Sequence, residues 1–543
     1  MNQPAPLYYL HNFNALINTV YSLYDDLITN EERHFYQCFS SLNTNAQALL
    51  VRLLSRKGAF FRTQKLRYNE ISDIPRAIDI LLGCEFIFRP LTARIEELFP
   101  VFTKAEWLKV INEKGLHACK KDVLKGYLSE GDDLLPAILA ASCDNLIKLN
   151  CRDIFNTYKL LFFGNGRQDL TDFITRDLGV FRYEDYLVHK QSRFFNSRQQ
   201  LDNMLHYYAV QEEFQHLKAY NTPELVSLLS RLPDLQAAGG ESYVDKLLNR
   251  RIQGAYIQIA RQLERLGSLD TALSIYRLCD LPPSRERQVR ILHKLRESDQ
   301  LNKLCKAIIL DGSEAEKRVA KQFIAKFKQT DKASSKAYKP PFEVFELKQS
   351  EQRVELALAA HLSKHGACFY VENQLFLSLF GLVFWPTIFA DVQGAFTHKF
   401  QYKPHDLSDV YFTDRRKKEI SQGWRRLEKW LAQPDLALAF FNKKQGIANP
   451  FVTWVEGLEQ VLTLALQNIP ANHFEVVFQR LWSNLKENSS GFPDLVLFPK
   501  EGGYTLIEVK GPGDRVQSNQ ARWFEYFAEH GIPHKVAGVV WLD

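Results

Sequence analysis

The sequence predicts a multidomain, mostly α-helical protein that ends in an α/β domain with a mixed sheet. Its 543 residues exceed one ordinary domain, and about three or four domains are expected. Apolar residues recur at helical spacing through roughly the first 340 residues, whereas clear β-branched strands follow only after about residue 490. Hydrophobic residues make up 45% and charged residues 24%, which excludes a disordered chain.

Several classes of protein are disfavoured by composition. The N-terminal stretch MNQPAPLYYLHNF lacks the basic and apolar regions of a signal peptide. The longest apolar run, 375–390, is interrupted by Ser378, Gly381 and Pro386 and is shorter than the ~20 residues of a membrane helix. The eight cysteines form no CxxC pair, so we expect reduced thiols in a cytoplasmic protein. The net charge of +6 permits a nucleic-acid partner without requiring one.

Residues 1–149 are expected to form a helical DNA-binding region. Two helical patterns, NAQALLVRLLSRKG and DIPRAIDILLGCEF, flank the connector FFRTQKLRYNEI, which favours a helix-turn-helix or winged-helix module. Basic residues that could bind phosphates are interleaved here with Phe60 and Phe61. A solvated helix face with core aromatics is the open alternative. The candidate DNA-binding residues are Arg52, Lys57, Arg62, Lys65 and Arg67.

A second small unit follows within the same region. In FTKAEWLKVINEKGLHACKKDVLKGYL, two amphipathic helices are expected on either side of Gly115, with Lys120, Lys121 and Lys125 on the second. The outline resembles a SAP-type DNA-binding module, and Lys121 joins the candidate DNA-binding residues.

Residues 150–338 predict a tetratricopeptide-like helical region. In YIQIARQLERLGSLDTALSIYRLCDLPP, Ala260, Gly267, Ala272 and Tyr276 stand at the spacing of such a repeat. Only one clear copy is present, so we expect a degenerate α-solenoid. The basic stretch 317–339, which ends in small polar residues before Pro340-Pro341, predicts a linker and a domain boundary.

Residues 339–543 predict the α/β domain. Helices are expected at roughly 348–388, 414–432 and 453–488, followed by the strands DLVLFP, YTLIEVK and KVAGVVWL. Residues 500–503 predict a tight turn between the first two strands. A helix from Ser518, its expected N-cap, to Gly531 joins the second strand to the third. A helical crossover beside a hairpin indicates a mixed sheet covered on both faces.

The hairpin carries the pattern of a metal-dependent phosphodiesterase. Pro493-Asp494 opens one strand, and after thirteen intervening residues Glu508-Val509-Lys510 lies on the next. Side chains two apart on a strand share a face, so Glu508 and Lys510 point the same way. Two carboxylates and the Val509 carbonyl are hard oxygen ligands suited to Mg²⁺ or Mn²⁺, and Lys510 could polarise the attacking water. An ordinary surface hairpin with a Glu–Lys pair is the alternative.

The segment PDLVLF…YTLIEVKGPGDRVQSNQARWFEYF resembles the VRR-NUC domain, a PD-(D/E)xK branch of the restriction-endonuclease-like fold. Three further segments resemble the Fanconi-associated nuclease family, so the resemblance covers nearly the whole chain. They are VENQLFLSLFGLVFWPTIF, GAFTHKFQYKPHDLSDVYF and LSRKGAFFRTQKLRYNEI. Animal members of the family carry an N-terminal ubiquitin-binding zinc finger, whose Cys/Cys/His/Cys pattern this sequence lacks, so the chain resembles a short, bacterial-type member.

The resemblance implies roles for individual residues. A metal-binding Glu on the helix before the sheet matches Glu372, and the catalytic Asp, Glu and Lys match Asp494, Glu508 and Lys510. Glu372, Asp494, Glu508 and the Val509 carbonyl would hold two ions of Mg²⁺ or Mn²⁺. Three residues just past the catalytic strand would lie near substrate, and Gln520 could instead touch metal-bound water. They are Asp514, Arg515 and Gln520.

The implied function is a structure-specific DNA nuclease of interstrand-crosslink repair. It would act as a 5′-flap endonuclease and 5′-to-3′ exonuclease on branched DNA such as flaps and crosslinked forks. We expect a cytoplasmic, nucleoid-associated bacterial enzyme, with no partner protein indicated. A DNA-binding scaffold with an inactive nuclease domain and an RNA-processing nuclease remain alternatives.

Overall fold

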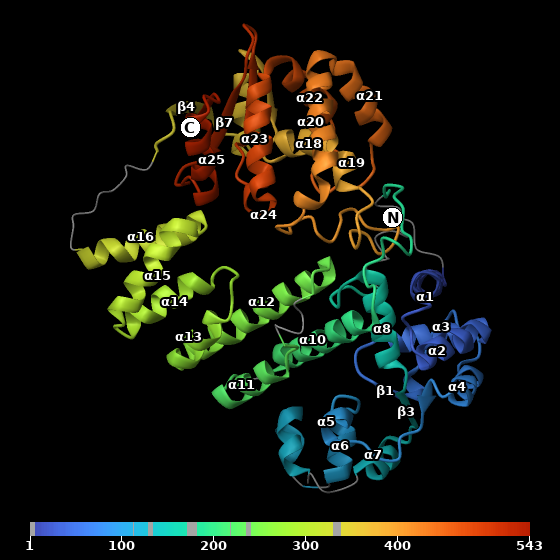
Figure 1. The fold of residues 1–543 in the computed structure, drawn as a ribbon. Coiled ribbons are helices and arrows are strands. Elements are labelled where there is room, and N and C mark those ends of the chain that lie inside the picture. The colour runs from blue at the N-terminus through green and yellow to red at the C-terminus, as the bar shows by residue number, and fades with distance from the viewer. Residues whose placement is uncertain are drawn as a thin grey trace. The chain divides into compact units, whose positions relative to one another are not determined.

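The computed structural model describes residues 6–111, 113, 115–128, 134–170, 182–217, 219–234, 240–328 and 338–542. The chain forms two compact units, drawn in Figure 1. Residues 1–180 with 193–216 make up the first unit, and residues 181–192 with 217–543 make up the second. Of the basic stretch 317–339 that predicted a linker, residues 317–328 belong to a helix, and residues 329–337 lie outside the described residues.

The first unit begins with a helical module that carries a small sheet. The helices start where the sequence supplies caps: Thr29 and Glu32 form a capping box, and the Asp73 side chain accepts from the Arg76 N–H. Three short strands add an antiparallel sheet in the order β1-β3-β2, as in a winged-helix module. The elements are α1 (Tyr8–Tyr24), α2 (Asn30–Ser41), α3 (Thr44–Leu54), β1 (Phe60–Arg62), η1 (Thr63–Lys65), α4 (Ile74–Gly83), β2 (Ile87–Phe88), β3 (Leu146–Leu149), α8 (Arg152–Phe163) and α10 (Arg198–His216).

A second small core lies between β2 and β3 in the chain. Trp107 is fully buried and packs against Phe99 and Phe102. The first helix of the predicted SAP-like pair is an α-helix, but the second is a 3-10 helix that begins at Lys121. The elements are α5 (Ile95–Leu98), α6 (Lys104–Ile111), η2 (Leu116–Ala118), η3 (Lys121–Tyr127) and α7 (Leu134–Ser142).

The second unit starts with consecutive helices that pack on their neighbours, as the predicted solenoid requires. Ala260, Ala272 and Tyr276 are fully buried, so these three residues of the repeat-like motif are core residues. The helices are α11 (Thr222–Arg231), α12 (Tyr243–Arg265), α13 (Leu269–Arg277), α14 (Ser284–Lys294), α15 (Ser298–Asp311) and α16 (Glu314–Lys328).

The nuclease-like part of this unit is built on a five-stranded mixed sheet in the order β4-β8-β7-β6-β5. β4, β8 and β7 run parallel, whereas β7, β6 and β5 pair antiparallel, which confirms the predicted mixed sheet. The strands are β4 (Phe342–Lys348), β5 (Gly366–Tyr370), β6 (Leu495–Pro499), β7 (Thr505–Lys510) and β8 (His534–Leu542).

Helices cover both faces of the sheet. On β6, Leu495 and Leu497 enter a core shared with α17, while Val496 and Phe498 enter a larger core shared with α18, α22, α23 and α25. No helix in the described parts of the chain is both long and apolar enough to cross a membrane. The helices are α17 (Val354–Leu362), α18 (Gln374–Val383), α19 (Trp385–Ile388), η5 (Asp414–Arg416), α20 (Lys417–Ala432), α21 (Pro434–Lys444), α22 (Leu458–Asn468), α23 (Ala471–Ser483), α24 (Leu485–Asn488) and α25 (Ser518–Glu529).

Further details differ from the sequence prediction. The helix expected over 348–388 is interrupted by β5, and β4 precedes it, so two strands were missed. The expected N-cap Ser518 is the first helical residue, because Gln517 caps α25. Tyr186 belongs to the core of the C-terminal α/β domain although it lies in the predicted helical-repeat region: its hydroxyl donates to the His398 carbonyl at 2.8 Å.

Candidate active site

The centre of the sheet brings the predicted catalytic residues together. Asp494 immediately precedes β6, and β7 carries Glu508 and Lys510 beside it. Along β7, Ile507 and Val509 point into the core beneath α17, so Glu508 and Lys510 share the opposite face. The alternation expected from the sequence is therefore present.

Asp494 is held by backbone groups from two other segments. Its carboxylate accepts a hydrogen bond from the Val509 N–H at 2.9 Å, which fixes the side chain against β7. Its carbonyl accepts from the N–H groups of Val371 and Glu372 at 2.8 and 2.9 Å. Three separate segments, at 371–372, 494 and 508–510, thus converge around one aspartate.

Glu508 is the most buried ionisable group of the site, with 1% of its surface exposed. Its Oε1 lies 2.8 Å from the Lys510 ammonium and accepts from the Gln520 amide at 2.5 Å. Lys510 also donates to Gln520 Oε1 at 3.2 Å, which closes a triangle of three side chains. This triangle fixes the directions of the Glu508 carboxylate and the Lys510 ammonium.

Burial shifts the acidity of both carboxyl groups. The pKa of Glu508 is raised to about 7 by burial and by the charge of Asp494, and the Lys510 ammonium opposes this shift. Burial also raises the pKa of Asp494, with a contribution from the charge of Glu355, while the Val509 N–H counteracts it. Because Asp494 and Glu508 lie close together in a medium of low dielectric constant, binding of a cation between them is electrostatically favourable.

The donor set fits a divalent cation. Glu508 Oε2 is buried and has no hydrogen-bond partner, although its Oε1 has two. Carboxylate and carbonyl oxygens are the ligands preferred by Mg²⁺ and Mn²⁺. Within the described ranges, no group of three or more acidic, histidine or cysteine side chains is gathered closely enough to hold a metal ion by itself. An ion here would therefore draw on a backbone carbonyl as well as on carboxylate side chains.

Glu372 lies in a different element from the one expected. It was placed on a helix, but it occupies the turn between β5 and α18, which begins at Gln374. Its backbone is left-handed, with φ of +35°, a rare conformation for a residue with a side chain. The Tyr370 hydroxyl donates to one carboxylate oxygen at 2.8 Å and the Asn373 amide donates to the other at 3.3 Å.

The residues expected near substrate lie at the start of α25 and in the turn before it. Gln520 forms a capping box with Gln517, and its amide contacts Glu508 and Lys510. Asp514 is exposed and accepts from the Gly511 N–H at 3.0 Å, so it shapes the turn. Arg515 is exposed next to it. Arg515 is thus the best placed of the three to meet a phosphate.

Three of the basic candidates in the first unit are exposed: Lys57, Lys65 and Arg67. Lys57 and Lys65 line a surface pocket of about 420 Å³ between β1 and the segment 96–101. Such side chains are free to meet a polyanion. They remain candidates for a nucleic-acid interface.

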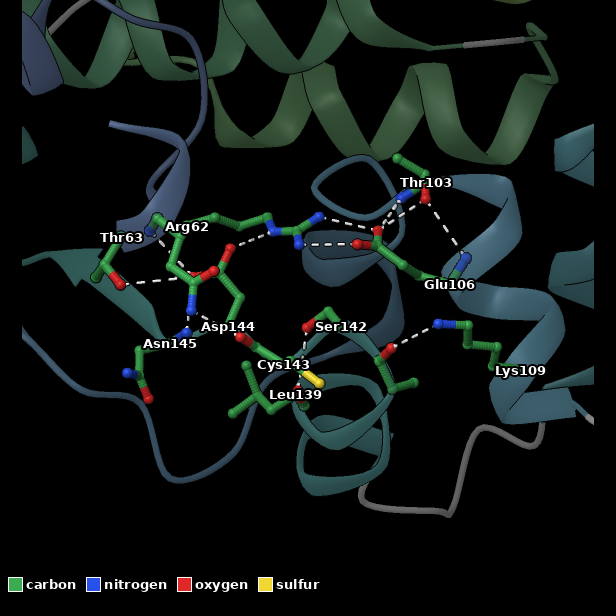
Figure 2. Close-up of polar contacts among 12 residues, drawn as sticks. Arg62, Thr63, Thr103, Glu106, Lys109, Leu139, Ser142, Cys143, Asp144 and Asn145 are labelled. Carbon is green, nitrogen blue, oxygen red and sulfur yellow. Dashed lines mark hydrogen bonds and ion pairs between the residues drawn. The ribbon is translucent and has the colours of Figure 1, made fainter. Parts of the chain in front are cut away.

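Arg62 does not have the exposed role expected of it. Figure 2 shows its guanidinium lying between Asp144 and Glu106. The Nε donates to Asp144 at 2.9 Å, and Nη1 and Nη2 lie 2.9 and 2.8 Å from the two carboxylate oxygens of Glu106. Only 6% of the Arg62 side chain is exposed. Its donors are committed to two carboxylates, so Arg62 ties β1 to the loop before β3 and to α6 instead of reaching a phosphate.

Two further candidates are also engaged within the unit. The Arg52 guanidinium lies 4.0 Å from the centre of the Tyr9 ring and pairs with Glu70 through its Nε at 2.8 Å. The Lys121 ammonium lies 4.9 Å from the Phe99 ring centre, and partial burial lowers its pKa. Arg52 and Lys121 each lie in a run of basic residues, and the sequence of such a run does not show which cations are paired within the protein.

Sequence reasoning missed three residues close to the candidate catalytic carboxylates. Tyr370 and Asn373 contact Glu372 directly, and Glu355, in the first turn of α17, contributes negative charge at Asp494. The only available signal was the YVEN segment, in which a phenol and an amide flank the glutamate closely. Because the strand β5 was not predicted, nothing indicated that these side chains face the hairpin.

A mixed sheet that presents Asp494, Glu508 and Lys510 on one face defines a nuclease of the PD-(D/E)xK class. Family models agree: "FAN1, HTH domain" matches residues 7–88 and "VRR-NUC domain" matches residues 431–541. The chain belongs to the Fanconi-associated nuclease family, since it is 33% identical over 554 residues to the "Fanconi-associated nuclease 1 homolog" of Pseudomonas aeruginosa. The match covers 99% of this chain and 96% of that relative.

More distant relatives and a solved structure agree with this assignment. The Arabidopsis thaliana homolog is 23% identical, over 99% of this chain and 67% of its own length. A solved structure described as "paFAN1 bound to 2nt 5'flap DNA with gap" superposes with a TM-score of 0.84 at 32% identity, covering 100% of both chains. The resemblance inferred from the sequence is thereby confirmed, and the family implies dependence on a divalent metal.

Proposed function

We propose that this protein is a structure-specific DNA nuclease that cuts 5′-flap DNA with the site formed by Asp494, Glu508 and Lys510. The observation that carries the proposal is the buried hairpin pair. Two carboxylates and a lysine lie on one face, and one carboxylate oxygen has no partner. The branched substrate is inferred from the similar structure that holds flap DNA.

The chain's own residues prepare the site for phosphodiester hydrolysis. Glu372, Asp494, Glu508 and the Val509 carbonyl would hold two ions of Mg²⁺ or Mn²⁺, which supply Lewis-acid charge at the attacking and leaving oxygens. Lys510 is held by Glu508 and Gln520, so its ammonium stands ready to stabilise charge on the phosphate. Arg515 is exposed past the strand and is proposed to meet the DNA backbone.

The proposed biological role is the processing of branched DNA during interstrand-crosslink repair. Both 5′-flap incision and 5′-to-3′ exonuclease action use the same hydrolytic chemistry, because they differ only in where the scissile phosphate lies. We propose that the enzyme acts on the bacterial chromosome in the cytoplasm, where flaps and crosslinked forks arise.

The exposed basic residues of the first unit give one prediction. Replacing Lys57, Lys65 and Arg67 with glutamate should weaken binding to branched DNA. The plot of log K against log salt concentration has a negative slope, and the magnitude of that slope should decrease by up to about 3. The matched control is reversal of Lys500, an exposed lysine in the turn after β6. Fluorescence anisotropy across a salt series measures both quantities. An unchanged slope would show that these three residues belong to an ordinary solvated surface and do not contact DNA.

The proposed function is tested by cleavage of DNA labelled at either end. The full chain with Mn²⁺ should cut a 5′ flap in preference to a 3′ flap and to plain duplex of the same sequence. Equal cutting of all substrates would retain the chemistry and contradict the flap preference. Equal cutting of an RNA flap would favour an RNA-processing nuclease, and no cutting of any substrate would favour a scaffold.

A further inference from the structure

The turn that carries Glu372 is built in an unusual way. Its left-handed backbone is uncommon for a glutamate, and residues held in such conformations persist only when their surroundings fix them. Two of the fixing contacts are backbone hydrogen bonds to the Asp494 carbonyl, from Val371 and Glu372. The backbone carbonyl of Asp494 thus holds the turn that carries Glu372.

The Asn373 side chain makes a second connection between the same two segments. Its Oδ1 accepts from the N–H groups of Gly491 and Phe492 at 3.0 and 3.2 Å, directly ahead of Pro493-Asp494. Its Nδ2 donates to Glu372 Oε1 at 3.3 Å. One half-buried amide therefore links the Glu372 carboxylate to the loop that leads into Asp494.

The loop end of this link is rigid. Gly491 has φ of +95°, and a Cβ there would lie 2.9 Å from the Asn519 backbone of α25, so only glycine fits. The Phe492 ring is fixed between Phe376 and Trp523, with ring centres 5.4 and 4.2 Å away. An amide anchored to this loop has a fixed position from which to orient a neighbour.

The other oxygen of Glu372 is held independently. The Tyr370 hydroxyl, at the end of β5, donates to Oε2 at 2.8 Å. Tyr370 is paired with Leu495 across the β5–β6 ladder, so its position is set by the strand that follows Asp494. Glu372 is itself exposed, and without these two donors its carboxylate would be free to rotate into solvent.

We propose that Asn373, with Tyr370 as its counterpart, is a positioning residue that orients the Glu372 carboxylate toward the metal site at Asp494. The inference rests on the proposed function, because it assigns these residues a task only if Glu372 binds a cation. Neither side chain needs to touch the ion or the substrate. Hydrogen-bond partners of metal ligands typically contribute about 10–100-fold to metal affinity.

The test is a double-mutant cycle with Mn²⁺ as the probe. Calorimetric titration of the full chain without DNA would compare Asn373→Ala and Tyr370→Phe, each alone and combined with Glu372→Ala. Each single variant should weaken Mn²⁺ binding, by about 10–100-fold for Asn373→Ala. Little further loss should follow when Glu372 is already alanine, because the residues act through it.

The controls separate a positioning role from a structural one. Tyr127→Phe, at an exposed tyrosine of the other compact unit, should leave Mn²⁺ binding unchanged. Tyr370→Phe keeps the ring and so keeps the inference testable if Asn373→Ala disturbs the loop. Equal losses of affinity with and without Glu372, or no loss in either single variant, would overturn the inference. If wild-type protein binds no Mn²⁺, the proposed function fails instead.

Discussion

Replacing Asp494 with asparagine is expected to abolish cleavage while leaving DNA binding intact. The amide oxygen can still accept the Val509 hydrogen bond, but the negative charge between β6 and β7 is lost. Removing one preorganised electrostatic group costs about 10²–10³ in rate, and a lost metal ligand should cost at least as much. Single-turnover cleavage with excess enzyme measures the chemical step, and anisotropy measures binding.

Two companion variants make this prediction specific. Lys510→Ala should show the same combination of lost cleavage and retained binding, because its ammonium is proposed to stabilise charge on the reacting phosphate. Asp435→Asn, at an exposed aspartate in the first turn of α21, should cleave like the wild type. Wild-type rates from either Asp494→Asn or Lys510→Ala would contradict the assignment of the site.

Arg62→Ala should produce the largest loss of stability of any change in the basic candidates. The substitution leaves Asp144 and Glu106 without their shared cation, and side-chain exposure at these carboxylates is only 2% and 15%. Breaking a buried ion pair on one side typically costs about 3–5 kcal/mol. Urea unfolding followed by circular dichroism measures this loss, and Lys65→Ala, at an exposed position, should stay within about 0.5 kcal/mol.

The effect of Arg62→Ala should also depend on pH. Burial alone would raise the pKa of Glu106, but the bonds from Arg62 and Thr103 lower it from 4.5 to about 2. Stability from a lowered acid pKa is present above about pH 4.5 and is lost as the pH falls toward 2. The stability difference between wild type and Arg62→Ala should shrink over that range. If Arg62→Ala unfolds at the same urea concentration as the wild type at neutral pH, the contacts of Arg62 with Asp144 and Glu106 contribute nothing to stability.

The hairpin of β6 and β7 was predictable because neighbouring parts of the sequence determine it. β6 and β7 are consecutive in the sequence and joined by a tight turn, so the spacing from Asp494 to Glu508 already fixes which residues are neighbours. The alternation of Ile507 and Val509 with Glu508 and Lys510 then assigns each to a face. No distant part of the chain is needed for this inference.

The surroundings of Glu372 were not predictable in the same way. The segment of β5 is short and lies between two helices, and it is a strand because it pairs with β6 more than 120 residues later, as Tyr370 with Leu495. The sequence therefore predicted a helix that extends beyond α18 on its N-terminal side, and this predicted helix included Glu372. Only the ladder shows that the residue lies in a turn beside Asp494.

The basic cluster shows a second limit of sequence reasoning. Arg62 stands in a run of cations that suggests a phosphate-binding surface, yet its partners Asp144 and Glu106 lie 82 and 44 residues further along the chain. Composition cannot distinguish a cation paired at such separations from a free one. The exposed neighbours Lys57, Lys65 and Arg67 remain consistent with the surface that the run suggested.

The most direct test of the account is the position of manganese in a crystal of the wild-type protein with Mn²⁺ and flap DNA. Anomalous scattering at the manganese edge should give density bounded by Asp494, Glu508 and the Val509 carbonyl, with Glu372 at its edge. Strong manganese density elsewhere in the protein, with none at this hairpin, would contradict the central claim that this sheet carries the nuclease site.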